Sequence, residues 1–523
     1  MSEHTTDVDI VIAGMGPVGK MMALMMGRRG YRVLIADKQS SQYLLPRAVA
    51  HDAEIARIFQ SAGMHVDKMP DAFEVYNDMY VWVNAERKVL FEVDWSQPDP
   101  QGWHSTYFYG QPGMEKHLDE RMRATGNVEA HWNTEVSFSG QDDQSVTVSL
   151  KDVTTGDTRA VRAKYLLGAD GANSDTRKSQ NISWNDLGYF FNWLVVDIVP
   201  GPDCNVTHLA LQIADPKRPT TVVPGGPGRR RWEFMLLPDE NPAELDNEEN
   251  IWRLLSAFDV RPDNSTMERH TIYRFESAWA TQWRSGRVFI MGDAAHKMPP
   301  FAGQGLASGL RDAMNLQWKL DLVLRGMASD ALLDTYTSER SVHIKDMIDF
   351  SIALGSIICI PDEEAAAARD AAMLADRAAG VQAAPPPKPR LGEGLWHGET
   401  GGYLSWQGRV TTAAHPATDR FDDVMGPGAL ILRDASLAEA LDAETVTQLT
   451  ELGVVVVTVD SAGSTRADIT AVADVDNHYA NWFADLGATA ALVRPDFYVF
   501  GSAADSAAVA TLAREFITEV TGK

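Results

Sequence analysis

Three glycines near the amino terminus have a spacing that can bind a dinucleotide. Gly14, Gly16 and Gly19 form the pattern G-x-G-x-x-G between the apolar run "DVDIVIA" and a helical pattern. The first glycine of such a pattern permits a tight turn, the second lets the backbone approach a pyrophosphate, and the third lets the helix pack on the strand. The free N–H groups of the helix N-terminus attract phosphate. This segment therefore predicts a dinucleotide site.

An acidic residue follows at the end of the next strand pattern, "YRVLIAD". Asp37 can there accept hydrogen bonds from ribose hydroxyl groups. Pro17 and Lys38 belong to the same predicted site. Such a unit does not by itself distinguish NAD from FAD, and a glycine-rich turn that binds nothing stays open as an alternative.

A second strand–turn–helix pattern, "FIMGDAAHKMPPFAGQGLASG", occupies residues 289–309. It must serve another part of the same ligand or a second ligand, and FAD is long enough to need both turns. Asp293 can accept from the ribityl hydroxyls, while the turn from Gly303 to Gly305 can bring backbone N–H groups to the flavin pyrimidine. The predicted contacts of this segment are Gly292, Asp293, Pro300, Gly303, Gly305 and Leu306.

These turns need an α/β domain to position them. The strand before Gly14, the helix after it and the strand ending at Asp37 predict a βαβ unit, and "KYLLGAD" predicts another strand with a Gly-Asp turn. Residues 186–276 contain four strand patterns joined by turns, which predicts an inserted antiparallel sheet. A hairpin is expected at Arg494-Pro495-Asp496.

The expected division has five parts. They are an FAD-binding domain at 1–185, a substrate-binding sheet domain at 186–276, the rest of the FAD-binding domain with a long helix at 277–360, an alanine- and proline-rich segment with a linker at 361–390, and a C-terminal domain at 391–523.

Composition excludes several classes of protein. The formal net charge is −25 and no lysine- or arginine-rich run occurs, which argues against nucleic acid or an anionic membrane as a partner. The apolar stretch 10–26 contains glycine, proline and lysine, so no membrane span is expected, and the acidic start is unlike a secretory signal. Cys204 and Cys359 are the only cysteines; they predict no disulfide framework, no clustered metal site and a cytoplasmic location.

Together with "GADGANSDTR" at 168–177, the two glycine-rich turns resemble the motifs of class A FAD-dependent aromatic hydroxylases. The resemblance implies that Asp170 and Arg177 hold FAD and shape the nicotinamide approach. It also implies that Arg47 in "PRAVAHDAE" and Gln111 in "YGQPGMEKHL" contact FAD. The strings "WLVVDIV", "RRRWEFMLLPDE" and "WFADLGATAALVRPD" most resemble 3-(3-hydroxyphenyl)propionate hydroxylases. Lys20 departs from the family pattern, which has an apolar residue there.

The resemblance implies an α/β fold: a Rossmann-like FAD-binding domain, an inserted antiparallel-sheet substrate domain and a thioredoxin-like C-terminal domain that lacks cysteine. It implies that NADH or NADPH reduces FAD and that O₂ forms a flavin C4a-hydroperoxide, which hydroxylates a phenol such as 3-(3-hydroxyphenyl)propionate. A homodimer is also implied. Hydroxylation of another phenol or polyketide ring, or a flavin reductase or dehydrogenase of the same fold without oxygen insertion, remains open.

Three residues are candidates for catalysis. His208, expected on a strand of the inserted sheet, could accept the phenolic proton, although a structural histidine is the competing interpretation. Arg231 could face the flavin or bind a substrate carboxylate, or it could be a solvated charge at the sheet edge. Pro300 is expected beside the flavin. The predicted substrate pocket consists of His51, Trp193 and Phe301.

Overall fold

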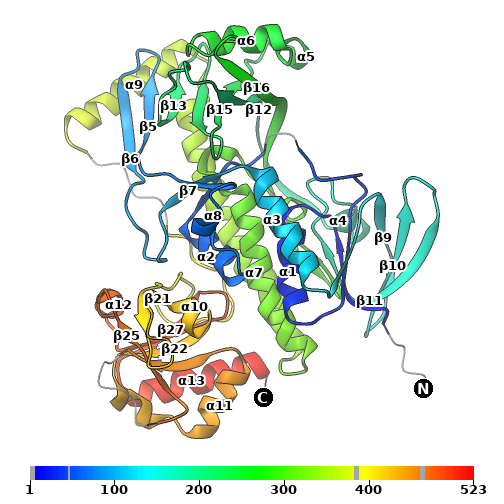
Figure 1. Ribbon diagram of the computed structural model, residues 1–523, viewed down its shortest axis with the longest axis vertical. Coiled ribbons are helices and arrows are strands. Elements are labelled where there is room, and N and C mark those ends of the chain that lie inside the picture. Colours follow the sequence, from blue (N-terminus) through cyan, green and yellow to red (C-terminus); the bar gives the residue numbers. More distant parts are fainter. Residues whose placement is uncertain (1–5, 45–46, 382–387, 460–465, 523) are drawn as a thin grey trace.

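The computed structural model describes residues 6–44, 47–381, 388–459 and 466–522. Figure 1 shows three bodies along the long axis: an upper sheet, a central α/β layer and a lower C-terminal domain. The long helices α7 (Gln304–Leu324) and α8 (Thr335–Ile358) run through the centre. Among the described residues, no helix combines the length and apolar character that crossing a bilayer requires.

The central layer contains the first sheet, in the strand order β17-β18-β11-β1-β2-β8. Strands β18, β11, β1, β2 and β8 are mutually parallel, and α1 (Pro17–Arg28) packs between α3 (Gln111–Ala124) and α7. The strand bounds are β1 (Val8–Ala13), β2 (Val33–Ala36), β8 (Val128–His131), β11 (Thr158–Gly168), β17 (Arg284–Ser285) and β18 (Val288–Ile290). The antiparallel strands β9 (Thr134–Gln141) and β10 (Val146–Asp152) extend it from β11.

The register of the first sheet brings three distant turns to one edge. Ala13 at the end of β1 is aligned with Gly168 at the end of β11, and Gly168 is aligned with Ile290 at the end of β18. Because the carboxyl ends of parallel strands meet at the same edge of a sheet, the three motifs found in the sequence begin side by side. This edge is where open α/β sheets bind ligands.

The upper body is the second sheet, in the order β19-β16-β12-β15-β14-β13-β5-β6. It is antiparallel except for the β13–β5 pair. Its strands are β5 (Met79–Asn84), β6 (Val89–Asp94), β12 (Trp184–Pro200), β13 (Ala210–Ala214), β14 (Thr220–Pro224), β15 (Arg230–Met235), β16 (Ser265–Ala280) and β19 (His296–Lys297). The short helices α5 (Pro242–Leu245) and α6 (Glu248–Ser256) lie above it.

The expected limits of the sheet domain need correction. Positions 186 and 276 both fall inside strands, β12 and β16, and the sheet takes β5, β6 and β19 from outside the range 186–276. The physical reason is that β5 pairs with the open edge of β13, more than a hundred residues away, and the side-chain pattern of a strand does not encode its neighbour.

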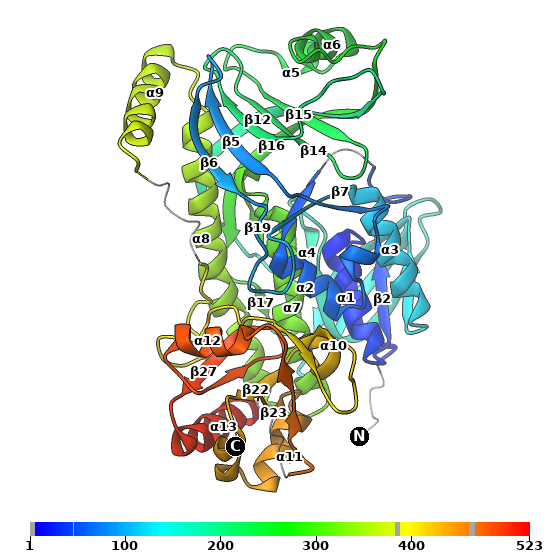
Figure 2. The ribbon, with the colours of Figure 1, turned by 60° about the vertical axis from the view of Figure 1, so that its left-hand side comes forward.

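The alanine-rich stretch forms the helix α9 (Glu363–Ala378), which packs beside β6 at the outer edge of the second sheet (Figure 2). Arg369 on α9 donates to the backbone oxygens of Ile357 and Ala214, which fixes the helix to α8 and β13. Most of the proline run expected as a linker lies at 382–387, outside the described residues.

The lower body contains a five-stranded sheet in the order β24-β23-β22-β26-β27. Its strands are β22 (Ala429–Leu432), β23 (Val455–Thr458), β24 (Thr470–Ala471), β26 (Ala490–Val493) and β27 (Val499–Ala503); its helices are α10 (Phe421–Met425), α11 (Ala443–Glu451), α12 (His478–Leu486) and α13 (Ser506–Thr521). The hairpin predicted at Arg494-Pro495-Asp496 is confirmed, since β26 and β27 pair antiparallel across it.

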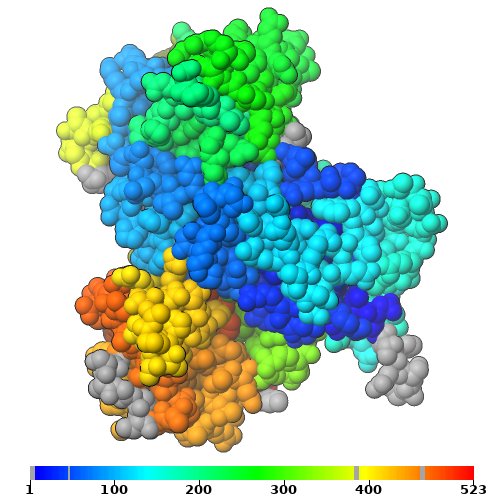
Figure 3. Space-filling view, in the orientation of Figure 1, coloured from blue at the N-terminus to red at the C-terminus, as the bar shows by residue number. Residues whose placement is uncertain are grey.

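The C-terminal domain packs directly on the central layer, as the contact between the yellow and blue surfaces in Figure 3 shows. Arg57 on α2 (Ala53–Ser61) makes two hydrogen bonds to Asp422, of 2.6 and 3.0 Å. Arg494 makes hydrogen bonds of 2.7 and 2.8 Å to the two carboxylate oxygens of Glu339 on α8. All four side chains are almost fully buried.

Candidate functional site

One cavity of about 1270 Å³ connects the edge of the first sheet, the face of the second sheet and the C-terminal domain. It brings together most of the residues predicted from the sequence. Those that line it are Gly16, Pro17, Arg47, His51, Gln111, Arg231, Gly292, Asp293, Pro300, Phe301, Gly303, Gly305 and Leu306. Those that do not line it are Gly14, Gly19, Asp37, Lys38, Asp170, Arg177, Trp193 and His208.

Two helices begin at this cavity without a side chain to cap them. The N-cap of α1 is Gly16, and the N-cap of α7 is Gly303, whose φ of 66° is left-handed. The first N–H groups of both helices therefore lack a side-chain acceptor, and both helix dipoles favour negative charge at this end. The cavity thus offers one anion-binding helix start near β1 and another near β18.

The three glycines of the first turn have different surroundings. A Cβ on Gly14 would lie 2.2 Å from the backbone oxygen of Ala169, and a Cβ on Gly19 would lie 2.1 Å from the backbone oxygen of Gly14. A Cβ on Gly16 would meet no protein atom within 4 Å, although Gly16 lines the cavity. The outer glycines serve close packing, whereas Gly16 leaves room for a ligand.

Gln111 at the start of α3 adds an unused polar atom. It lines the cavity, and its buried Oε1 has no hydrogen-bond partner among the described residues. Its Nε2 donates to Glu115 at 2.8 Å, and Glu115 in turn pairs with the buried Lys20 at 3.1 Å. Lys20, which departs from the family pattern, therefore holds the carboxylate that orients Gln111. Two uncapped helix starts, an open Gly16 and this free acceptor fit an elongated dinucleotide such as FAD.

Four of the predicted cofactor contacts make other interactions. Asp37 accepts from the backbone N–H of Met15 at 2.9 Å, which holds the glycine turn. Asp170 accepts from the Ser174 hydroxyl at 2.5 Å and from the backbone of Thr176, which holds the middle motif. Arg177 donates to the backbone oxygen of Ile182 at 2.6 Å and stacks on Trp184, while the exposed Lys38 lies 3.3 Å from Asp175. Their direct contacts with FAD stay predictions.

Arg47 and Asp293 both line the cavity and form a loose ion pair. A guanidinium nitrogen of Arg47 lies 3.9 Å from a carboxylate oxygen of Asp293, and the guanidinium stacks on the ring of Tyr43. Burial opposes the charge of Arg47, but the Asp293 carboxylate raises its pKa. These two residues join the segment after β2 to the turn after β18.

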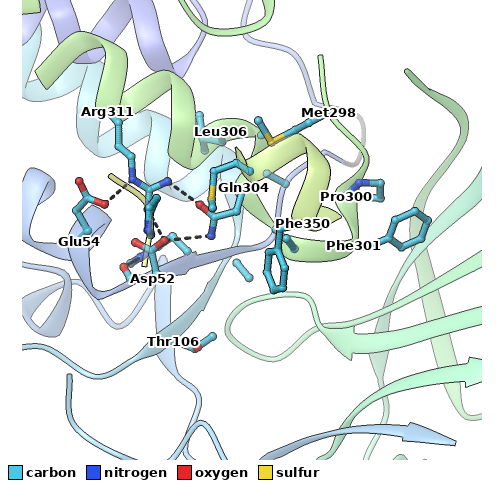
Figure 4. A pocket seen from close by; sticks show the side chains of 18 of the residues that line it. Asp52, Glu54, Thr106, Met298, Pro300, Phe301, Gln304, Leu306, Arg311 and Phe350 are labelled. Carbon is cyan, nitrogen blue, oxygen red and sulfur yellow. Dashed lines mark hydrogen bonds and ion pairs between the residues drawn. The ribbon is translucent and has the colours of Figure 1, made fainter. Parts of the chain in front are cut away.

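A partly buried charge cluster, which the sequence did not reveal, lies beneath the start of α7 (Figure 4). Arg311 donates to Gln304 at 2.6 Å, to Glu54 at 2.5 Å and to Asp52 at 2.5 Å. Burial alone would raise the pKa of Asp52, but the Arg311 charge lowers it. The only local signal is that Gln304 and Arg311, seven residues apart, lie on one face of a helix. The cluster fixes the turn that contains Gly303 and Gly305.

His51 lines the cavity, but its ring packs in a cage of aromatic side chains. It lies 5.1 Å from Tyr107 and 5.7 Å from Phe59, measured between ring centroids. Nδ1 is 2.9 Å from the backbone oxygen of Asp52, so it donates there, and Nε2 has no partner among the described residues. Burial lowers the pKa of His51 to about 4. Its imidazole is therefore neutral at pH 7.

This burial makes stability depend on pH. The unfolded chain binds a proton at His51 below pH 6.5, whereas the folded chain does so only below about 4, so stability falls as the pH drops between those values. The wild type is expected to lose about 2 kcal/mol more than His51→Phe between pH 7 and pH 5. Urea unfolding of both proteins at the two pH values measures this. Equal losses of stability in the two proteins would contradict the lowered pKa of His51.

The prediction for His208 was wrong in its structural premise. His208 is exposed in a bend that precedes β13 rather than on a strand, and it does not line the cavity. Its backbone oxygen accepts from Arg230. The apolar run "HLALQIA" does form a strand, but the strand begins only at Ala210.

Arg231 is not a solvated edge charge. It is buried on β15 and donates to both carboxylate oxygens of Asp197, at 2.6 and 3.0 Å. Asp197 also pairs with Arg269 at 2.7 Å, and Arg231 donates to the backbone oxygen of Arg47. Arg231 thus joins the second sheet to the segment that contains Arg47. Glu233, two residues after Arg231 on β15, also lines the cavity.

We call the part of the cavity lined by strands β5, β6 and β12–β15 the sheet chamber. Part of its wall is aromatic, formed by Tyr80, Trp82 and Phe91 and by Trp95 just beyond β6. Pro300 and Phe301, which directly precede the start of α7, also line the cavity (Figure 4). Trp193 packs behind Phe301, with ring centroids 5.6 Å apart. The sheet chamber can hold a flat apolar ring.

Comparison with known proteins gives matches along most of the chain. A family model described as an FAD binding domain matches residues 7–351, and one described as the HcaD C-terminal domain matches residues 402–518. A probable NADH-specific resorcinol 4-hydroxylase of Rhodococcus jostii (strain RHA1) is 37% identical over 517 residues, covering 98% of this chain and 95% of that protein. A 3-(3-hydroxy-phenyl)propionate/3-hydroxycinnamic acid hydroxylase of Mycolicibacterium gilvum (strain PYR-GCK) is 33% identical over 518 residues, covering 95% and 89%.

Two solved structures have a similar fold. The flavin-dependent monooxygenase PieE in complex with FAD and substrate gives a TM-score of 0.79 at 21% identity, covering 99% of this chain and 100% of that one. A ternary complex of aklavinone-11 hydroxylase with FAD and aklavinone gives 0.79 at 22% identity, with the same coverage.

Proposed function

Because this chain belongs to the family of FAD-dependent aromatic hydroxylases, we propose that it hydroxylates a phenol that carries a second substituent meta to the hydroxyl group, using NADH and O₂. Resorcinol and 3-(3-hydroxyphenyl)propionate, the compounds named for its relatives, share that pattern. The observation that carries the proposal is the single cavity, which joins two uncapped helix starts to an aromatic chamber on the second sheet.

FAD would lie along the edge of the first sheet. The start of α1 at Gly16 would hold the pyrophosphate, and Gly303 and Gly305 at the start of α7 would hold the flavin ring. Gln111 and Asp293 would accept hydrogen bonds along its length. Bound FAD supplies electron transfer from NADH and the activation of O₂.

The protein itself would position the ring and exclude water. Pro300 and Phe301 directly precede the start of α7, and Phe301 packs against Trp193 of β12, so a ring in the chamber would lie beside the flavin. The aromatic walls of the chamber would displace water from the reacting carbon, and a dry site protects reactive intermediates from hydrolysis. The phenolic hydroxyl makes the ring carbons ortho and para to it electron-rich, which directs the added oxygen.

We also infer that the first sheet is a Rossmann-like FAD-binding domain, that the second sheet is the substrate domain and that the C-terminal domain is thioredoxin-like. A mixed five-stranded sheet with helices supports the last inference. With no cysteine after Cys359, that domain would act in packing rather than in redox chemistry. Both cysteines are free thiols, which favours a cytoplasmic location. A homodimer stays a prediction from the resemblance.

The function is tested by NADH oxidation in air with a panel of phenols, with product masses measured. Resorcinol or 3-(3-hydroxyphenyl)propionate is expected to stimulate oxidation and to gain one oxygen atom. NADPH in place of NADH is the matched control for the electron donor. Stimulated oxidation that yields only hydrogen peroxide with every phenol would contradict hydroxylation of this class and would favour a flavin reductase of the same fold.

A further inference from the structure

The floor of the sheet chamber is built from rows of side chains that run across the second sheet. In one row, the register aligns Val195 of β12 with Glu233 of β15, Glu233 with Thr221 of β14, and Thr221 with Gln212 of β13. Aligned residues of neighbouring strands point to the same face of a sheet. All four line the cavity. Glu233 is therefore placed where a ring in the chamber would lie.

The two neighbouring rows locate Glu233 along the chamber. In one, Arg231 donates to the backbone oxygen of Arg47, at the side where the cofactor would lie. In the other, Met235 is aligned with Trp193, whose ring packs against Phe301. Glu233 lies between these rows, midway between the cofactor side and the Phe301 side of the chamber.

The carboxylate of Glu233 is free to accept a hydrogen bond. Its cation partner is Arg231, whose Nη1 lies 3.6 Å from Oε1, longer than an ordinary hydrogen bond, so the carboxylate keeps acceptor capacity toward the chamber. The other polar groups of the floor are occupied: the Thr221 hydroxyl donates to Gln212 at 2.7 Å, and Gln212 donates to the Tyr80 hydroxyl. Burial raises the pKa of Glu233, and the Arg231 charge opposes this only in part.

The cations closest to Glu233 are already paired with Asp197. Arg231 makes two hydrogen bonds to Asp197, and Arg269 pairs with the same carboxylate at 2.7 Å. With Glu233 ionised, the group Arg231, Arg269, Asp197 and Glu233 is balanced in charge. A second carboxylate brought by a ligand would find no unpaired cation in this part of the floor and would lie near Glu233, which is unfavourable.

We propose, on the basis of the function proposed above, that Glu233 determines substrate specificity by accepting a hydrogen bond from a ring hydroxyl and by disfavouring an anionic substituent. A neutral 1,3-dihydroxybenzene has two hydroxyl groups, one available to Glu233 while the other directs hydroxylation. A 3-hydroxyphenylalkanoate places a carboxylate in the same space. Sites built to hydrogen-bond a hydroxyl group discriminate strongly against ligands that lack it.

The test measures binding without turnover. The oxidised holoenzyme is titrated with resorcinol and with 3-(3-hydroxyphenyl)propionate in the absence of NADH, and Kd is read from the change in flavin absorbance. We expect the wild type to prefer resorcinol. Glu233→Gln, which keeps the shape and removes the charge, is expected to weaken resorcinol binding about tenfold and to shift the ratio of the two Kd values toward the propionate by about tenfold or more.

Glu276→Gln is the matched control, because Glu276 also lines the cavity but pairs with Lys297 at 2.8 Å. It should leave the ratio of Kd values unchanged. If Glu233→Gln does not retain FAD, the wild type titrated at successively lower pH replaces it. Because burial raises the pKa of Glu233, the ratio should move toward the propionate as the pH falls; the charged groups around Glu233 are Arg231 and Asp197, and Tyr80 faces it neutral.

Two results would overturn the proposal: a Kd ratio that Glu233→Gln leaves unchanged, or a wild type that binds the propionate more tightly than resorcinol. Neither result contradicts the proposed function, provided that one of the two phenols still gains an oxygen atom in the presence of NADH. Failure of both phenols to gain oxygen would instead remove the proposed function, whatever the Kd ratio.

Discussion

A Gly16→Ala variant is expected to fold normally and to bind FAD about 100-fold more weakly, a loss of about 2.8 kcal/mol. The φ of Gly16, −74°, suits alanine, and the added methyl group would meet no protein atom within 4 Å. The methyl group would instead occupy the space in which the pyrophosphate must approach the backbone. Flavin absorbance of the purified protein and FAD titration of the apoprotein measure the loss.

Gly110→Ala is the matched control. Gly110 also precedes a helix, has a φ of −83° and has no atom within 4 Å of an added Cβ, but it does not line the cavity. The Gly110→Ala variant should therefore keep its FAD. Gly14→Ala should differ from both by unfolding more easily, since its methyl group would collide with the Ala169 backbone at a φ of 100°. Full FAD content in Gly16→Ala would place the pyrophosphate elsewhere.

An Arg494→Leu variant is expected to lose about 3–5 kcal/mol of stability. Arg494 is fully buried between Glu339 of α8 and Asp496 of its own hairpin, and Lys319 of α7 pairs with Glu339 at 2.7 Å. Burial alone would raise the pKa of Glu339, but Arg494 and then Lys319 hold it far below its usual range. Without Arg494, two buried carboxylates share a single lysine. Urea unfolding followed by tryptophan fluorescence measures the change.

Arg409→Leu tests the same chemical change at the surface. Arg409 also makes two hydrogen bonds to one aspartate, Asp476, both of 2.7 Å, but the two side chains are largely exposed. Exposed pairs contribute about 0–1 kcal/mol, so this variant should be close to the wild type. If Arg494→Leu and Arg409→Leu lose equally little stability, the buried pairs of Arg494 do not hold the C-terminal domain to α7 and α8.

The glycine-rich turns at the edge of the first sheet could be found from the sequence because their signal is local. The spacing of Gly14, Gly16 and Gly19 depends only on one strand, one turn and one helix start, and the same holds for Gly303 and Gly305. The register of the first sheet then brings these turns together, as expected for parallel strands, whose carboxyl ends share an edge.

The sheet chamber could not be found in this way. Glu233 faces the chamber because β15 pairs with β12 and β14, and β5 joins the sheet beside β13. A single strand shows which residues alternate but not which face is covered. The pattern also does not fix where a strand begins: His208 was expected on a strand, but that strand begins two residues later, at Ala210.

The sequence by itself determined the family, the two glycine-rich turns and the order of the elements, since each depends on neighbouring residues. Only the tertiary structure decided that Arg311 joins Asp52 to Glu54 under α7, that Lys20 supports Gln111, and that Glu233 rather than His208 faces the chamber. These contacts join segments up to a few hundred residues apart. Their partners are set by strand pairing and helix packing, which no local pattern of residues encodes.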